Sequence, residues 1–273
     1  MTLKARNRSL LIFNFLSILC LVGSSILLVY TIVNGTFEKF FSESFFSFKN
    51  FSLFKKNEKS VVLSLMAIQI YIPVTTFLLF YNFEKTQSPI IILFGLFLFG
   101  MQLEISKLLI GILGLKNSYS DFHLFLANLA FLGKLISIMS LFLISAYSKE
   151  TQKLNIEIDI IVLLSICIFA TFYIPFNTFA STNTFGLRPG YLQLVLILFS
   201  IITILTIITF IFTYKETENI LFIKLLFSYL PILTGNVLTT ETNIFILIIL
   251  GIIFLYGGTY YLFKFTHKLY SWD

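Results

Sequence analysis

Charged residues are scarce in this chain, and so are the residue types on which most enzymes depend. Only 12% of the 273 residues are Asp, Glu, Lys or Arg, against about 25% in a typical soluble domain. Cysteine and histidine occur twice each, and His123 and His267 lie far apart. There is no His-Glu-x-x-His, Gly-x-Ser-x-Gly, paired-cysteine or phosphate-loop motif. We therefore expect no metal site and no cofactor. No recognisable catalytic motif supports an enzymatic role.

Long apolar runs take the place of these residues. The chain is 58% hydrophobic, with a mean hydropathy of +0.94. A helix needs about 20 apolar residues to cross the hydrocarbon core of a bilayer. Eight runs approach or exceed this length: residues 10–33, 61–81, 90–115, 122–147, 160–179, 191–213, 219–238 and 243–263. Helices are the expected spanning element, because a helix satisfies its own backbone hydrogen bonds within the segment.

The runs predict an all-α fold, a polytopic membrane helix bundle of about eight transmembrane helices. They use nearly the whole chain, so residues 1–273 are expected to form a single membrane-embedded domain. Within it we expect an N-terminal anchor helix (1–33), an outer amphipathic loop (34–60), a seven-helix bundle (61–263) and a cytoplasmic tail (264–273).

Lysine and arginine predict the orientation, because cytoplasmic loops carry an excess of both. With the N-terminus inside, the inner segments hold Lys4, Arg6, Arg8, Lys85, Lys149, Lys153, Lys215, Lys264 and Lys268. The outer loops then hold only Lys116 and Arg188, apart from loop 34–60 with five lysines. We expect both termini to be cytoplasmic. The richness in Phe, Ile, Leu, Lys and Asn suggests an AT-rich bacterial genome, and hence a bacterial inner membrane.

The net charge of +6 is interpreted mainly as this topology signal. The expected surroundings are therefore the lipid bilayer, and nucleic acid is not an expected partner.

The outer loop has a pattern of its own. Phenylalanines recur at helical spacing, with charged and serine residues between them: Phe37, Phe41, Phe45, Phe48 and Phe51. This pattern is typical of an amphipathic helix in the membrane interface. It could form a collar on the helix ends, or serve in partner binding or gating.

Two charged residues interrupt consecutive apolar runs. Glu104 lies near the middle of run 90–115 and Lys134 near the middle of run 122–147. A charge at that depth costs about 3 kcal/mol on insertion scales, so such residues face a bundle interior and find partners. Small residues share a helix face with each charge, Gly100 with Glu104 and Ala130 with Lys134, which favours close helix packing. We expect the two helices to be antiparallel neighbours, with Glu104 paired to Lys134.

Two interpretations of these charges remain open. One is a structural ion pair that fixes helix register. The other is a proton-coupled, ion-coupled or solute-binding site. Lys107 makes the local charge positive, so an anionic solute or a lipid headgroup is a candidate ligand. The substrate- or ion-binding candidates are Glu104, Lys107, Lys134, Gln102 and Asn128.

A Tyr-[Ile/Leu]-Pro-x-x-Thr pattern occurs three times, beginning at Tyr71, Tyr173 and Tyr229. Each copy lies in an apolar run, where proline is expected to kink the helix and to free a backbone carbonyl. Kinked helices with polar neighbours line cavities in many transporters. The helix-kink or cavity-wall candidates are Gln69, Tyr71, Pro73, Tyr173, Pro175, Asn177, Tyr229 and Pro231.

Two functions follow from these patterns. The first is a small permease or transporter with a polar mid-membrane site. The alternative is a non-transporting sensor, assembly or scaffold subunit, whose buried ion pair is structural and whose partners are other membrane subunits.

Overall fold

The fold is known from a computed structural model, which describes residues 2–34, 57–86, 88–115, 120–147, 155–182 and 184–270. The predicted amphipathic phenylalanine pattern of residues 37–51 lies outside these residues. The described helices are α1 (Leu3–Val33), α3 (Glu58–Phe83), α4 (Pro89–Glu104), α5 (Lys107–Ile112), α6 (Asp121–Tyr147), α7 (Ile156–Tyr173), α8 (Leu192–Thr217), α9 (Leu221–Glu241) and α10 (Phe245–Tyr270). Two antiparallel strands, β1 (Phe176–Ser181) and β2 (Leu187–Pro189), form a hairpin between α7 and α8.

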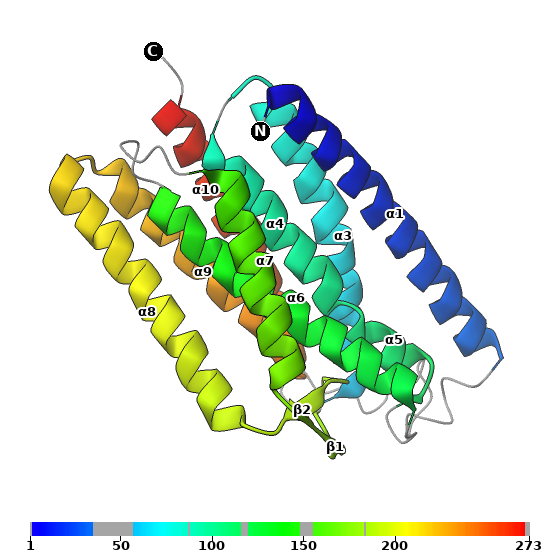
Figure 1. The fold of residues 1–273 in the computed structure, drawn as a ribbon. Helices are drawn as coiled ribbons and strands as arrows, with labels where there is room; N and C mark the ends of the chain where they lie inside the picture. Colours follow the sequence, from blue (N-terminus) through cyan, green and yellow to red (C-terminus); the bar gives the residue numbers. More distant parts are fainter. Residues whose placement is uncertain are drawn as a thin grey trace.

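Eight helices of the described chain are long and apolar enough to cross a membrane, with α4 and α5 together forming one candidate span. This confirms the predicted helix bundle with eight candidate spans, to which the structure adds the small hairpin. The long helices run side by side between two ends of the bundle (Figure 1). The first and last described helices place their terminal ends at the same end, and the hairpin lies at the other. The cytoplasmic location of that end remains a prediction from the lysines and arginines.

Small residues bring two helix pairs into close contact. At the crossing of α4 and α6, a Cβ added to Gly133 would lie 2.5 Å from the backbone nitrogen of Glu104, and closer still to the carbonyl oxygen of Gly100. At the crossing of α9 and α10, a Cβ on Gly235 would lie 2.7 Å from the carbonyl oxygen of Gly251. Inside a membrane, packing of this kind drives helix association.

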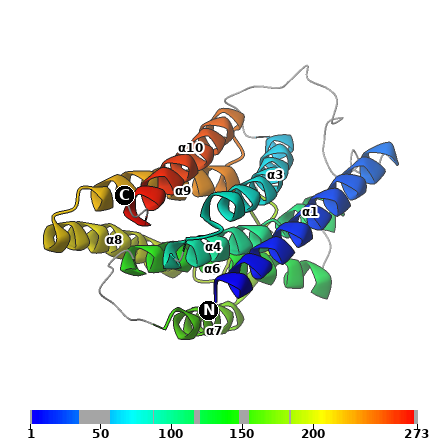
Figure 2. The same cartoon turned by 90° about the horizontal axis from the view of Figure 1, so that it is seen from above.

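Helix α1 lies at the edge of the bundle, beside α3 (Figure 2). Polar contacts join them: Ser24 donates to the Gln69 side chain over 2.8 Å, and Arg6 donates to the carbonyl oxygen of Phe83 over 2.7 Å. Gln69 thus bonds to a neighbouring helix.

Several helices are longer than their apolar runs. Helix α3 begins at Glu58, after an Asn57 side chain that accepts a hydrogen bond from the Lys59 nitrogen over 2.9 Å. The last three residues of the predicted outer loop are therefore helical. Helix α10 continues to Tyr270, so the predicted tail 264–273 is mostly helix. Polar side chains do not interrupt the backbone hydrogen bonds of a helix. Both helices therefore extend beyond their apolar residues.

The helix predicted around Pro175 is wrong, and the third span is tightened at one point. The third run is helical from Pro89 to Ile112 but tightens around Ser106, where the backbone bonds span three residues: Ser106 to Leu103 at 3.0 Å and Leu108 to Ile105 at 2.8 Å. Tightening of this kind inside a helix often marks a functional hinge. The fifth run ends as a helix at Tyr173. Ile174 is extended, the conformation favoured before proline, and Pro175 leads into β1. Pro73 and Pro231 do lie inside helices, as predicted.

Candidate functional site

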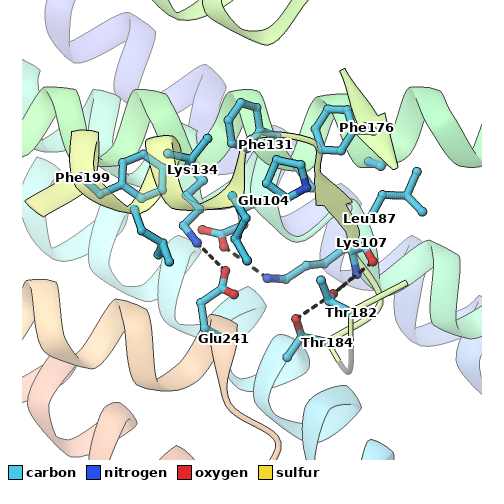
Figure 3. Close-up of a pocket in the computed structure, with 17 residues that line it drawn as sticks. Glu104, Lys107, Phe131, Lys134, Phe176, Thr182, Thr184, Leu187, Phe199 and Glu241 are labelled. Carbon is cyan, nitrogen blue, oxygen red and sulfur yellow. Dashed lines mark hydrogen bonds and ion pairs between the residues drawn. The ribbon is translucent and has the colours of Figure 1, made fainter. Parts of the chain in front are cut away.

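Four charged side chains converge where α4, α5, α6 and α9 meet (Figure 3). Lys107 Nζ lies 3.2 Å from Glu104 Oε1, and Lys134 Nζ lies 2.6 Å from Glu241 Oε1. The Glu104–Lys107 pair is buried, with side chains only 3% and 5% exposed. The Lys134–Glu241 pair is more open, at 21% and 38%. The site therefore has a buried half and an accessible half.

The predicted pairing of Glu104 with Lys134 is wrong. Glu104 and Lys107 are three residues apart in the third span, so they lie on the same helix face and pair with each other. Lys134 pairs instead with Glu241, the last residue of α9. Sequence reasoning missed Glu241 because it lies just beyond run 219–238. It is nevertheless the only acidic residue between positions 219 and 272, and that signal could have identified it.

A cavity of about 130 Å³ lies among these charges. Its wall includes the rings of Phe131 and Phe199, and Lys134 Nζ lies 5.3 Å from the centre of the Phe199 ring. The hairpin segment closes one side through Thr182, Thr184 and Leu187. The cavity thus combines a charged floor with an aromatic wall.

Glu104 is incompletely satisfied at this cavity. Its Oε1 accepts a hydrogen bond from Lys107, which also donates to the carbonyl oxygen of Thr240 over 2.8 Å. Its Oε2 is buried and has no hydrogen-bond partner among the residues that the structure describes. A buried charged oxygen without a donor is costly, and such groups gather at functional sites. The atom is free to accept a proton or a hydrogen bond from a bound molecule.

The hairpin is held against the bundle by Phe185. This side chain is buried, and its backbone has a φ of 65°, a region that bulky residues rarely adopt. Its ring packs on α5 at Gly111, where an added Cβ would lie 2.9 Å from ring atom Cε2. The strained loop therefore depends on a glycine in the neighbouring helix, and strain of this kind is typical of ligand-closing segments.

The structure brings together only part of the predicted site. Glu104, Lys107 and Lys134 line the cavity, whereas Gln102 and Asn128 do not. Both of the latter are half-buried, and Gln102 Oε1 is another buried oxygen without a partner among the described residues.

The cavity lining includes none of these proline-motif candidates: Gln69, Tyr71, Pro73, Tyr173, Pro175, Tyr229 and Pro231. The Tyr71 hydroxyl is 2.6 Å from Thr259 Oγ1, Tyr229 is buried beside Phe210, and exposed Tyr173 stacks on Phe169. Asn177 pairs with Arg188 in the hairpin. Tyr71 therefore packs α3 against α10 and Tyr229 packs α9 against α8, whereas the Tyr173 contact lies within α7.

Glu241 also changes the charge of the site. The predicted set of Glu104, Lys107 and Lys134 carried one surplus positive charge, which was the reason to expect an anionic ligand. With Glu241 the four groups sum to zero when all are ionised. In the described part of the chain, no group of three or more His, Cys, Asp or Glu residues is placed to hold a metal ion.

The chain matches no protein-family model, no curated protein and no solved structure. Its function therefore has to be argued from the geometry and chemistry of the site.

Proposed function

We propose that this multi-pass membrane protein is a small permease, and that Glu104 binds either its small charged solute or the proton that drives transport. We place it in the bacterial cytoplasmic membrane with both termini inside, on the distribution of lysine and arginine. The observation that carries the proposal is the Oε2 atom of Glu104, a buried carboxylate oxygen without a donor among the described residues, in a residue that lines a cavity.

The tightened turn in the third span supports the same function. A stretch of three-residue hydrogen bonds inside a helix often marks a functional hinge or a strained sequence. Here the turn lies between the two buried charges, Glu104 and Lys107. A change of this turn would alter the hydrogen bonding of both residues at once.

The charge balance bears on the solute class. A neutral set of two carboxylates and two ammonium groups suits a zwitterionic solute. The Oε2 atom of Glu104 by itself favours a solute that donates a hydrogen bond, such as a cation. An anion, as the sequence predicts, would need Glu104 or Glu241 to be protonated. The experiment therefore compares all three solute classes.

A non-transporting scaffold or sensor subunit is the alternative. It is favoured by the Lys134–Glu241 contact of 2.6 Å and by the two bonds that hold Lys107. Such a protein would use the charges only to hold α4, α5, α6 and α9 together, and its partners would be other membrane subunits.

Glu104→Gln is expected to reduce transport at least about tenfold, because it removes a charged acceptor worth about 1.5–3 kcal/mol. The measurement is the transient current of proteoliposomes on a solid-supported membrane after addition of glycine, methylammonium, lactate or phosphate. We expect a current from the unaltered protein with at least one solute. Glu218→Gln, the same change at an exposed carboxylate after α8, should keep that current.

Two results would count against the permease. One is the absence of current from the unaltered protein with all four solutes in both vesicle orientations. The other is an equal current from Glu104→Gln. Either would favour the scaffold.

A further inference from the structure

A second cavity lies at the opposite end of the bundle from the hairpin, where three helices begin. Its volume is about 210 Å³, and its lining comes from the first turns of α1, α4 and α7. Figure 2 looks onto this end and shows the start of α1 beside α7. The lining residues that matter below are Arg6 of α1 and Ser88 at the start of α4.

Arg6 is a buried cation with only neutral partners. It is 4% exposed. Its guanidinium donates to the carbonyl oxygens of Phe83, Glu84 and Thr86 and to the Asn7 side chain. No carboxylate among the described residues forms an ion pair with it, and Nη1 donates in only one of these bonds. A buried charge without a counter-charge is costly, so Arg6 favours an anion in this cavity.

Ser88 supplies a second donor without a partner. It occupies the N-cap position of α4 but makes no capping hydrogen bond through its side chain. Its Oγ is buried and has no partner among the described residues, and the residue is 3% exposed. A hydroxyl in this position can donate to an anion in the cavity.

The helix ends add positive potential to the cavity. The first backbone N–H groups of a helix have no intrahelical acceptor and attract anions. The first turns of α1 and α4 contain no acidic residue. Helix α7 differs, because Glu157 and Asp159 in its first turn offset its own positive end. The attraction therefore comes from α1 and α4, together with Arg6.

We propose that this cavity binds a phosphate group, held by the Arg6 guanidinium and the Ser88 hydroxyl and attracted by the positive ends of α1 and α4. The phosphate can come from the headgroup of an anionic phospholipid or from the free ion. The surroundings favour the lipid, because the next turns of α1 expose Leu11, Ile12 and Phe15, along which acyl chains can lie. Exposed Lys4 and Arg8 add attraction at the rim.

The test measures binding to the full-length protein in a neutral detergent by calorimetry. The probes are dihexanoyl phosphatidylglycerol, dihexanoyl phosphatidylcholine and inorganic phosphate. We expect saturable 1:1 binding of phosphatidylglycerol and weaker binding of phosphatidylcholine. If inorganic phosphate binds as tightly as phosphatidylglycerol, the site takes the free ion; if it does not compete, the site takes the lipid. Both results support a phosphate site.

Substitutions locate the binding. Ser88→Ala should weaken it about tenfold, the loss expected for one hydrogen bond to a charged group, and Arg6→Gln should abolish it. Ser200→Ala is the matched control, because Ser200 is exposed and bonds only to its own helix. Arg6 also holds the end of α3, so if Arg6→Gln fails to fold, Ser88→Ala, which leaves those bonds intact, decides the test.

The proposal is overturned if none of the probes binds. It is also overturned if Ser88→Ala binds phosphatidylglycerol as tightly as the unaltered protein, because the lipid would then be adsorbed at exposed lysines and arginines. The site shares no residue with the Glu104 cavity, so neither result affects the proposed transport function.

Discussion

Lys107→Met is expected to lower the free energy of unfolding by about 3 kcal/mol, because it leaves one partner of a buried ion pair behind. Lys107 supplies the only hydrogen bond that the Glu104 carboxylate accepts in the described part of the chain, and it also bonds to the Thr240 carbonyl. The measurement is thermal or denaturant unfolding of the purified protein in detergent.

The double variant Glu104→Gln/Lys107→Met should recover much of this loss, because a neutral amide costs less to bury than a carboxylate. Lys134→Met is the matched control. It removes a lysine from the more exposed pair, where an ion pair is worth about 1 kcal/mol or less. Equal losses in Lys107→Met and Lys134→Met, or no recovery in the double variant, would contradict the buried pairing.

Gly133→Ala is expected to destabilise the protein by about 2 kcal/mol, within the range for overpacking. The added Cβ would meet the backbone of Gly100 and Glu104. Backbone atoms cannot move aside as a flexible side chain can, so α4 and α6 would have to separate. The separation would also displace Glu104, and the same unfolding assay records the effect.

Gly257→Ala provides the comparison, because nothing lies within 4 Å of a Cβ added there. Alanine is the better helix former, so this variant should keep or slightly raise the stability. A Gly133→Ala protein as stable as Gly257→Ala would mean that α4 and α6 are not in close contact.

Hydropathy predicted the candidate spans well, because eight long apolar runs leave a helix bundle as the simplest solution. Small residues likewise indicated the contact between α4 and α6, through Gly100. Hydropathy could not predict where a span tightens. Residues 104–107 include no glycine or proline to mark the turn, and Lys107 bonds to a distant partner, the Thr240 carbonyl on α9.

The three proline motifs show a similar limit. Their local sequences are nearly the same, yet Pro73 and Pro231 lie inside helices while Pro175 follows the end of one. What distinguishes Pro175 is the segment after it, which pairs with β2 and bonds Gly190 to the Pro175 carbonyl. The strand β2 lies outside the motif, so the motif alone could not predict that Pro175 leads into a strand.

The most direct test of the account is whether water reaches the Glu104 cavity. Ala130 lines this cavity on α6, and Ala170 on α7 lines an apolar groove with no charged residue in its lining on the described chain. After replacement of Cys20 and Cys167, each alanine is changed to cysteine and treated with a membrane-impermeant thiol reagent in sealed vesicles of both orientations.

Thiols react as thiolates, which form only in contact with water. The account predicts that Ala130→Cys is labelled from one side of the membrane and that Ala170→Cys is not labelled. If Ala130→Cys is as unreactive as Ala170→Cys from both sides, the cavity is dry, and the four charges serve only to hold the helices together.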